Sequence, residues 1–422
     1  MIKQDTNSVF KEIWQKIFQT GGTRIYTQIL GILTLSITAK VLGPEGRGEI
    51  ASVITIVGGF ATILHLSMGQ VVIYISAKEK NMDWFTDAFY NLVFILIILS
   101  IIGYVSFILM LLFFNHSFGH VRGLALILAM IMLPFMVWEQ YGGNLILAID
   151  RIDISNKYNI IGKTIGFLFL IAVYTLFGLN VYTALLSIII GQVIISSGGF
   201  IVLYKITNGP FRISYSWIKN ILGQGLKLHL NTMFAFLLSG TDILMLNLFS
   251  NLDDVGYYQF GAQITQSVLI LPAVVSSIMY GKVSTIGPND SWPYHKKIIK
   301  QIFFMLLIII LFLYFTAHWW IPIIAGNSFK PSIILFKYQI FTVLGLSIST
   351  MMAPQWISRG YFTAISSLAI ISGLLNVGLN YFLIQKIGVL GAVYSTLFIS
   401  FTSLGINGIM YIIFNKTNKV SI

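Results

Sequence analysis

The sequence predicts an all-α polytopic membrane protein with about twelve transmembrane helices. Hydrophobic residues make up 56% of the 422 residues and charged residues only 9%, whereas soluble domains are about one-quarter charged. Apolar runs long enough to cross a bilayer recur as far as the C-terminus. The basic residues are also distributed between the connections in the way that orients membrane helices.

The expected spans follow one another with short connections, and the ends of the apolar runs set their bounds. They are expected at residues 16–41, 49–77, 85–114, 121–148, 156–177, 181–205, 220–248, 255–280, 298–317, 332–356, 360–384 and 388–414. Segment 206–219 falls at the midpoint and links two halves, and segment 281–297 is expected to form an interfacial turn. We therefore expect an N-terminal six-helix bundle over 1–205, a cytoplasmic linker, and a C-terminal six-helix bundle over 220–422.

Lysine and arginine indicate which side of the membrane each connection faces. With the N-terminus in the cytoplasm, most basic residues fall in cytoplasmic segments. The outer segments hold Lys40, Arg47, Arg122, Lys330 and Lys386. This bias predicts that both termini lie in the cytoplasm. The first apolar stretch is long, carries Arg24 and lacks a signal-peptide cleavage pattern, so we expect it to remain as a span.

Composition and motifs exclude several classes of function. The net charge of +12 follows from the loop bias, so nucleic acid is not expected as a partner. Cysteine is absent, which excludes disulfides and a thiol nucleophile and fits a protein of the bacterial envelope. The histidines and carboxylates show no metal-ligand spacing, and neither GxSxG nor a P-loop occurs. We expect no metal, no cofactor and no catalytic residues, and hence a protein that is not an enzyme.

The two halves correspond to one another at an offset of about 203–210 residues. The turn at 42–48 corresponds to 250–256, and Asn180–Ala184 corresponds to Gly388–Ala392. Six spans per half is an even number, so both halves enter the membrane from the same side. They would then be related by a pseudo-two-fold axis along the membrane normal, with a binding site at the repeat interface.

Two cations occupy equivalent places in this repeat, Arg24 in the first span and Lys227 in the seventh. A charge at the bilayer centre costs about 2.5–3.5 kcal/mol on insertion scales, so it needs a purpose. Gln28 shares a helical face with Arg24, and Asn231 shares one with Lys227. Polar stripes in membrane helices face a cavity or another helix, which favours a central cavity for an anionic substrate. The alternative is that both side chains snorkel to the head groups.

Four further polar residues within the spans are candidates for the site, with alternatives open. Lys163 is either a third cavity cation or a snorkelling side chain. Glu139 and Gln140 follow Pro134, whose kink suits a cavity wall. They would bind sugar hydroxyls, couple an ion, or form a structural pair with Lys163 or Arg24. Asp242 would bind a coupling ion or cap a broken helix.

Two histidines, His65 and His229, also lie within expected spans. A lone histidine in a membrane helix more often forms a hydrogen bond to a neighbouring helix than relays protons. We therefore expect interhelical hydrogen bonds at both positions, with a proton relay as the alternative.

Several segments resemble the polysaccharide-exporter branch of the multidrug/oligosaccharidyl-lipid/polysaccharide (MOP) superfamily, the Wzx-type flippases. Residues 42–49 are similar to that family's turn after the first span, and Asp242–Tyr258 to its seventh-span pattern. The block Asn376–Ile384, followed by Gly388–Ala392, is similar to its signature for the eleventh and twelfth spans. Together with the twelve-span plan, the resemblance covers nearly the whole chain.

The resemblance implies a V-shaped central cavity between two bundles and a cargo of oligosaccharide linked to undecaprenyl diphosphate. The cargo would cross a bacterial cytoplasmic membrane by alternating access, for biosynthesis of O-antigen of lipopolysaccharide, capsule or exopolysaccharide. The expected partners are this lipid, membrane lipids, a polysaccharide polymerase and a chain-length regulator. Such flippases carry a first-span cation where Arg24 stands. Of the cations that some members carry in the fourth to sixth spans, only Lys163 is present.

Physical argument and resemblance thus give one predicted site. The diphosphate and sugar would be bound by Arg24, Lys227, Lys163, Gln28, Asn231 and Gln140. Asp242 and Glu139 would couple transport to H⁺ or Na⁺, or the gradient of newly made lipid-linked sugar would suffice.

Other functions fit the sequence less well. A cation-coupled multidrug-type antiporter of the same superfamily is the main alternative, but it would favour an acidic cavity. A flippase for the peptidoglycan precursor usually carries two further spans. A polysaccharide polymerase or ligase needs a larger outer loop than the segment at about 317–331.

Overall fold

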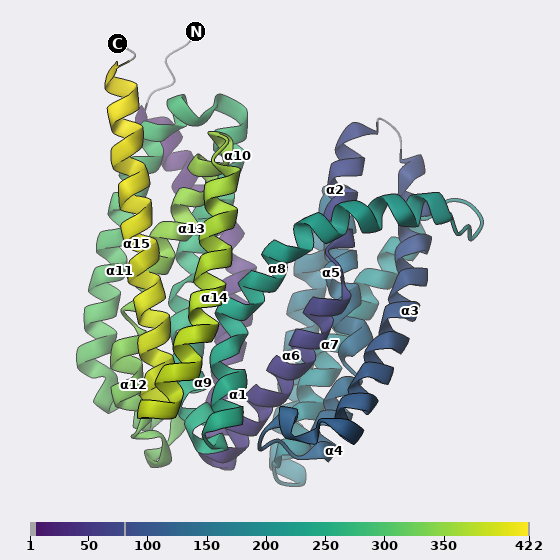
Figure 1. Cartoon of the computed structure of the whole chain (residues 1–422), viewed down its shortest axis with the longest axis vertical. Coiled ribbons are helices and arrows are strands. Elements are labelled where there is room, and N and C mark those ends of the chain that lie inside the picture. The colour runs from purple at the N-terminus through teal and green to yellow at the C-terminus, as the bar shows by residue number, and fades with distance from the viewer. Residues whose placement is uncertain (1–5, 80–81, 421–422) are drawn as a thin grey trace. The chain divides into compact units, whose positions relative to one another are not determined.

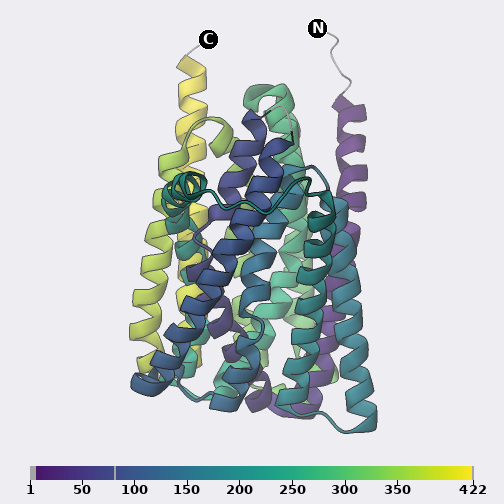
Figure 2. The same cartoon turned by 90° about the vertical axis from the view of Figure 1, so that its right-hand side faces the viewer.

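The computed structural model describes residues 6–79 and 82–420, with side chains from residue 21 to residue 413 except 80, 81 and 83. Within these residues the regular structure is helical and no strand occurs (Figures 1 and 2). The chain ends, for which a cytoplasmic location is predicted, lie outside the described residues.

The helices confirm the predicted all-α membrane class. They are α1 Thr6–Leu64, α2 Met68–Lys78, α3 Asp83–Phe113, η1 Asn115–Phe118, α4 Gly123–Met130, α5 Leu133–Ala148, α6 Ile152–Leu176, α7 Val181–Ile206, α8 Tyr215–Phe249, α9 Leu252–Val268, α10 Ile270–Ile286, α11 Pro288–Ala325, η2 Asn327–Phe329, α12 Ser332–Gln339, α13 Thr342–Ser358, α14 Phe362–Ile387 and α15 Val389–Val420. Among the described residues, 11 helical stretches are long and apolar enough to cross a membrane. The chain is therefore a multi-pass membrane protein.

A kink in α1 explains why 11 stretches match about twelve predicted spans. The first stretch, Gly21–Leu64, contains most of the first predicted span and about half of the second. Within it Gly43 has φ 69° and ψ −174°, a conformation that residues with a β-carbon rarely adopt. Pro44 follows, and its fixed φ suits the first turn of a new helix. The predicted turn at 42–48 is thus confirmed.

The second predicted span contains a break that the sequence analysis did not predict. Between α1 and α2, Leu66 and Ser67 have φ values of 48° and 51°. The hydroxyl of Tyr141 donates a hydrogen bond of 3.0 Å to the carbonyl oxygen of His65. Irregular backbone is tolerated at membrane depth where neighbouring elements satisfy its polar groups. Tertiary contacts from α5 therefore help to hold the break.

Other helix ends fall where prolines and glycines stand. Pro134 lies in the first turn of α5, so the expected kink divides the fourth predicted span into α4 and α5. The expected turn at 281–297 is largely wrong, because α10 continues to Ile286 and α11 begins at Pro288. Gly287, with φ 83°, joins these two helices.

The chain divides into two compact units, one of residues 33–256 and one of residues 1–32 with 257–422. The division passes through α1 and α9 and leaves the predicted linker inside the first of these units. There the backbone N–H of Ser214 donates a hydrogen bond of 2.9 Å to Oδ1 of Asn91 in α3. The six-helix bundles predicted on either side of the linker do not coincide with this division and stay a prediction.

Close helix packing in unit 33–256 depends on glycine. A β-carbon placed on Gly162 of α6 would lie 2.6 Å from the carbonyl oxygen of Gly191 in α7. One placed on Gly166 would lie 2.7 Å from the carbonyl oxygen of Ser187. Small residues four apart permit this close approach of membrane helices. The contact fixes α6, which carries Lys163, against α7.

The two corresponding turns of the repeat pack on each other in this same unit. A β-carbon on Gly48 would lie 1.8 Å from the carbonyl oxygen of Leu252, and one on Gly256 would lie 2.0 Å from that of Pro44. Each glycine thus meets the residue four places before the other glycine. A two-fold relation produces this kind of reciprocal contact. The geometry supports the correspondence predicted for these turns.

Unit 1–32 with 257–422 buries amide groups that bond within one helix and between helices. Nδ2 of Asn380 donates a hydrogen bond of 3.0 Å to Oδ1 of Asn376, and both residues are fully buried. Nε1 of Trp356 donates one of 2.9 Å to Oδ1 of Asn407. The signature asparagines of the eleventh predicted span therefore contribute to packing within the membrane.

Candidate functional site

The first predicted polar stripe lies on α1, in unit 1–32 with 257–422. Arg24 is exposed, although it falls within a candidate span, and Gln28 is half-buried. Nε2 of Gln28 donates a hydrogen bond to Oγ of Ser267 in α9. Gln263, one turn before Ser267, donates from Nε2 to the carbonyl oxygen of Gly31 at 3.2 Å. Part of this stripe therefore joins α1 to α9, and Gln28 has a structural role that the sequence analysis did not assign.

A groove beside this stripe is mainly apolar. The groove has a volume of about 400 Å³ and lies between α1, α9, α10 and α11. It is lined by Gly21, Ile25, Gln28, Ile29, Ile32, Ser267, Ile270, Leu271, Val274 and Met305. Apart from Gln28 and Ser267 the lining side chains carry no hydrogen-bonding group, so the groove suits hydrocarbon better than sugar.

The second predicted polar stripe lies on α8, in unit 33–256. Lys227 and Asn231 are exposed, whereas His229 between them is only 5% exposed. Asp242 lies further along α8 and is 3% exposed. The helix is continuous from Tyr215 to Phe249, so the alternative that Asp242 caps a broken helix is wrong.

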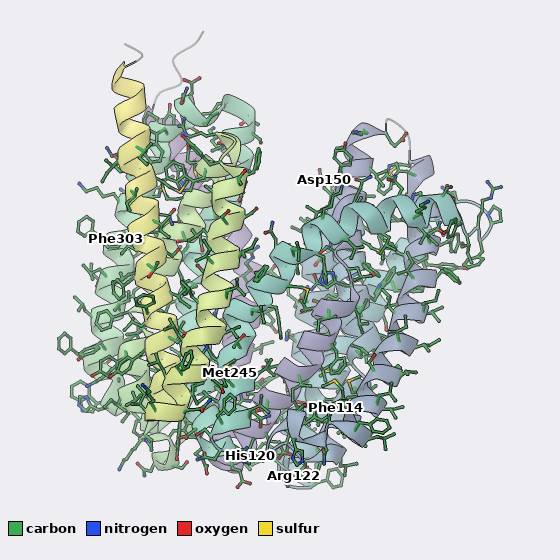
Figure 3. The ribbon with its side chains drawn as sticks, viewed as in Figure 1. Phe114, His120, Arg122, Asp150, Met245 and Phe303 are labelled. Atoms are coloured by element: carbon green, nitrogen blue, oxygen red, sulfur yellow. The ribbon has the colours of Figure 1, made fainter. Side chains whose placement is uncertain are left out.

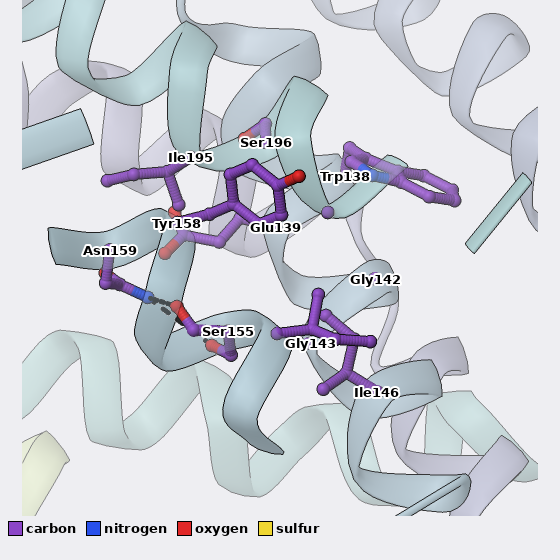
Figure 4. A pocket seen from close by; sticks show the side chains of 12 residues that line it. Trp138, Glu139, Gly142, Gly143, Ile146, Ser155, Tyr158, Asn159, Ile195 and Ser196 are labelled. Atoms are coloured by element: carbon purple, nitrogen blue, oxygen red, sulfur yellow. Dashed lines mark hydrogen bonds between the residues drawn. The ribbon is translucent and has the colours of Figure 1, made fainter. Parts of the chain in front are cut away.

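Glu139 lines a small pocket between α5, α6 and α7 (Figure 4). Its Oε2 accepts a hydrogen bond of 2.6 Å from Nε2 of Gln192, which also donates to Oγ of Ser196 at 3.4 Å. The space open to the centre of a water-sized molecule is about 40 Å³. That space holds water or a small ion but not a sugar. Of the roles predicted for Glu139, ion binding fits this geometry and sugar binding does not.

The remaining predicted residues of this unit lie outside that pocket. Gln140 and Lys163 are exposed, and neither lines the Glu139 pocket. Among the residues that the structure describes, no ion pair joins Glu139 to Lys163. The carboxylate is held by Gln192 instead, so the alternative of a buried Glu139–Lys163 pair is wrong. Lys163 remains a candidate for substrate binding or for snorkelling.

Arg24 with Gln28 and Lys227 with Asn231 thus belong to different units. Within each unit the two side chains lie on one helix, as the spacing predicts. A cavity that both units would share stays a prediction. A metal centre has no support within the described ranges, where no three histidine, aspartate or glutamate residues gather.

An ion pair that the sequence analysis missed joins Glu49 of α1 to Arg122, the residue directly before α4. Nε of Arg122 lies 2.8 Å from Oε1 and 2.9 Å from Oε2 of Glu49, and the Arg122 backbone N–H also donates to Oε1. The Glu49 side chain is 0% exposed and that of Arg122 53% exposed. Hydrogen bonding to Glu49 raises the pKa of the Arg122 guanidinium. The clearest indication of this ion pair in the sequence was Glu49, a carboxylate directly after the predicted turn at 42–48.

His120, two residues before Arg122, makes a further contact in this part of unit 33–256. Nδ1 of His120 lies 2.7 Å from the carbonyl oxygen of Asn247 in α8. Figure 3 shows His120 and Arg122 at the opposite end of the unit from Asp150. These groups bond to one another, so we assign the cluster a structural role.

Gln192, the partner of Glu139, is a residue of the candidate site that the sequence analysis missed. It is a single amide in the apolar helix α7, directly after Gly191. An amide so placed in a membrane helix is a signal for an interhelical hydrogen bond. Its partner could not be named because it lies on another helix, 53 positions away in the sequence.

A family model described as "Polysaccharide biosynthesis protein" matches residues 13–280. The match extends over more than half of the 422 residues. None of the curated proteins matches the sequence.

The fold is similar to several solved membrane transporters. One is the "Lipid II flippase MurJ, inward closed conformation", with 15% identity and a TM-score of 0.74, covering 95% of this chain and 87% of that chain. Another is an inward-facing multidrug resistance MATE family transporter of the MOP superfamily, with 16% identity and a TM-score of 0.70, covering 92% and 96%. An outward-facing transporter of the same description has 18% identity and a TM-score of 0.61, covering 98% of both chains. At these identities the likeness shows the fold alone.

Proposed function

The chain belongs to the polysaccharide biosynthesis protein family, and on that basis we propose that it is a lipid-linked oligosaccharide flippase. Its substrate would be an oligosaccharide repeat unit on undecaprenyl diphosphate, moved across a bacterial cytoplasmic membrane by alternating access. The translocated units would enter O-antigen of lipopolysaccharide, capsule or exopolysaccharide. We place both termini in the cytoplasm, from the distribution of lysine and arginine.

Exposed cations inside apolar helices carry this proposal. Arg24, Lys163 and Lys227 are all exposed, yet each lies within a candidate membrane span. Such charges are costly unless water or an anion accompanies them. A diphosphate supplies the anion, because its oxygens accept charge-assisted hydrogen bonds from guanidinium and ammonium groups.

The other candidates divide according to their surroundings. Asn231 and Gln140 are exposed and carry amides that suit sugar hydroxyls. Gln28 would reach the substrate only by exchanging or sharing its bond to Ser267. The apolar groove beside Gln28 suits hydrocarbon, such as the prenyl tail of the substrate.

We further propose that Glu139 or Asp242 binds a coupling ion, H⁺ or Na⁺. The Glu139 pocket has the right size for an ion with its water. Asp242 is buried within α8, on the same helix as Lys227. A polysaccharide polymerase and a chain-length regulator would act on the delivered units in the same membrane.

A cation-coupled multidrug-type antiporter remains the second candidate. The half-buried Glu139 and the buried Asp242 favour it, because carboxylates within spans suit cationic substrates. Efflux of ethidium by cells that produce the protein would support this alternative. The flippase proposal predicts no efflux above the level of cells without the protein.

The proposal is tested in a strain whose surface polymer depends on this chain. Replacement of Arg24 or Lys227 by alanine should reduce surface polysaccharide at least tenfold, since loss of one charged phosphate contact costs about 1.5–3 kcal/mol. Lys386→Ala, an exposed lysine at the end of α14, is the matched control and should leave the polymer unchanged. The amount of protein in the membrane is measured in parallel. Normal polymer in the Arg24→Ala, Lys227→Ala double variant would contradict the role of these cations.

A further inference from the structure

Two buried histidines from distant parts of the chain meet within unit 33–256. His65 lies at the break between α1 and α2, and His229 lies on α8. Their ring centroids are 5.4 Å apart and the rings are nearly perpendicular, at 87°. The two residues are 4% and 5% exposed. Oγ of Ser67 lies 3.3 Å from Nδ1 of His229, so the expected interhelical hydrogen bond of His229 is present.

The hydrogen bonds of His65 define where a proton would bind. The backbone N–H of Ser67 donates to Nδ1 of His65 at 2.9 Å. Nδ1 is therefore the acceptor nitrogen of a neutral imidazole, and the ring hydrogen is on Nε2. A second proton must bind at Nδ1. Protonation of His65 thus removes the acceptor that the Ser67 N–H uses.

That hydrogen bond supports a strained turn. Leu66 and Ser67 both have positive φ, although neither is glycine. Such conformations persist only where surrounding contacts hold them. The bond from Ser67 to His65 spans two residues, like the turns that asparagine makes with its own backbone. Loss of this bond therefore weakens the contact that holds the break between α1 and α2.

Helix α8 packs directly on this turn. A β-carbon on Gly225 would lie 2.6 Å from the carbonyl oxygen of Leu66 and 3.3 Å from Cα of Met68. Oγ of Ser67 also lies 3.0 Å from Oγ1 of Thr232 on the same helix. Lys227 lies between Gly225 and Thr232 on α8. A change in the turn would therefore move the contact surface of the helix that carries Lys227.

We propose that His65 and His229 form a proton-binding site. Proton binding there would weaken the contact between α8 and the turn that separates α1 from α2. Protonation of His65 removes the Ser67 bond, and protonation of both rings places like charges next to each other, which repel. The proposal deepens the flippase proposal, on which it rests for its purpose, because the proton would control the helix that carries Lys227. Neither histidine is assigned as a substrate ligand.

Few other ionisable groups face this pair. Helix α5 contributes Tyr141, whose hydroxyl bonds the His65 carbonyl oxygen, while Glu139 on the same helix is bonded to Gln192. On α8 the nearest charge is Lys227, which is exposed. Between Met68 and Ser76, α2 carries no charged residue. Imidazole is therefore the main group at this contact whose ordinary pKa lies near neutral pH.

The test measures the distance between α2 and α8 at two pH values. The chain contains no cysteine, so Tyr74→Cys and Leu230→Cys, both at exposed positions, provide a unique pair of sites for nitroxide labels. The labelled full chain in lipid nanodiscs is studied by pulsed electron paramagnetic resonance at about pH 8 and about pH 4. With both histidines present, we expect the distance distribution to shift between these pH values.

Two substitutions of His65 distinguish an effect of proton binding from a general disturbance of the fold. His65→Asn keeps an acceptor oxygen at the δ position but takes up no proton, so the distance should stay at its high-pH value throughout. His65→Gln lacks the δ acceptor, so the distance should stay at its low-pH value. His229→Gln should reduce the shift. The control His295→Gln replaces a buried histidine of α11, in the other unit, and should leave the shift intact.

These measurements test the proton-binding site directly and need no transport substrate. A pH-dependent shift that persists in His65→Asn, or no shift with both histidines present, would overturn it. Imidazole ¹⁵N signals of the same samples confirm whether each histidine titrates and whether removal of one changes the titration of the other. A chain that shows the shift but flips no lipid-linked oligosaccharide would contradict the proposed function and leave the proton site supported.

Discussion

Arg24 and Gln28 occupy one face of α1 but have different surroundings. Arg24 is exposed, whereas Gln28 is half-buried and donates a hydrogen bond to Ser267 of α9. A hydrogen bond between membrane helices contributes about 0.6 kcal/mol on average. The two residues therefore contribute differently to function and to stability, although they share a stripe.

Replacement of these two residues should separate the two contributions. Gln28→Ala should lower stability by about 0.6 kcal/mol, because it removes the bond between α1 and α9. Arg24→Ala should leave stability unchanged and reduce surface polysaccharide. Thermal unfolding in one detergent measures the first effect. Ser267→Ala should lower stability by a similar amount, and the effects of Gln28→Ala and Ser267→Ala should not add. Additive losses would show that the two side chains stabilise the fold independently.

The pair of Glu49 and Arg122 should respond unequally to loss of either partner. Arg122→Ala leaves a fully buried carboxylate without its guanidinium and should cost about 3 kcal/mol. Glu49→Gln leaves an arginine that is half exposed to solvent, keeps an acceptor oxygen, and should cost about 1 kcal/mol. Thermal unfolding of both variants checks the order. An equal or opposite order would show that the buried carboxylate is satisfied without Arg122.

At the scale of the helices, backbone contacts at glycine set how closely elements approach. Gly48 and Gly256 each face a backbone carbonyl of the other's turn, at Leu252 and Pro44. A carbonyl cannot rotate away as a flexible side chain can. The turn after the first predicted span and its counterpart after the seventh are thus built into one contact.

Alanine at either glycine should disrupt this contact. Gly48→Ala and Gly256→Ala each place a β-carbon within about 2 Å of a carbonyl oxygen, so each should cost about 2 kcal/mol or more. Gly378→Ala in α14 is the control, since no atom lies within 4 Å of its β-carbon position. Melting temperatures of the purified variants give the comparison. A Gly48→Ala protein as stable as the Gly378→Ala protein would contradict the packing of the two turns.

Sequence reasoning located the helix breaks that have a local cause. Gly43, Pro44 and Pro134 restrict the backbone by their own covalent structure, so the kinks at these positions were predictable. The break at Leu66 and Ser67 was not, because the bonds that hold it come from tertiary structure, among them that of Tyr141 on α5.

The same limit applies to the candidate site. Helical spacing placed Arg24 with Gln28 and Lys227 with Asn231, because spacing alone fixes which residues share a face. It could not give Gln192 as the partner of Glu139, since that pairing depends on how α5 packs against α7.

At the scale of the whole molecule, the chain is a multi-pass membrane protein of the polysaccharide biosynthesis protein family. The family match confirms the resemblance, and it covers the motifs after the first span and in the seventh predicted span. The fold is also that of solved MOP-superfamily transporters. Beyond the family and the fold, we propose that exposed cations within the spans receive the diphosphate of a lipid-linked sugar.

The most direct test is transbilayer movement in vesicles that contain only the purified protein and lipid. The probe is a fluorescent oligosaccharide on undecaprenyl diphosphate, and dithionite, which does not cross the membrane, quenches it in the outer leaflet. We predict that vesicles with the protein lose nearly all fluorescence. Protein-free vesicles and those with the Arg24→Ala, Lys227→Ala variant should lose about half, because the inner leaflet stays protected. Equal loss with the unaltered protein and with the double variant would contradict the role of the cations. Half loss with the unaltered protein, with or without a proton or sodium gradient, would contradict the flippase function itself.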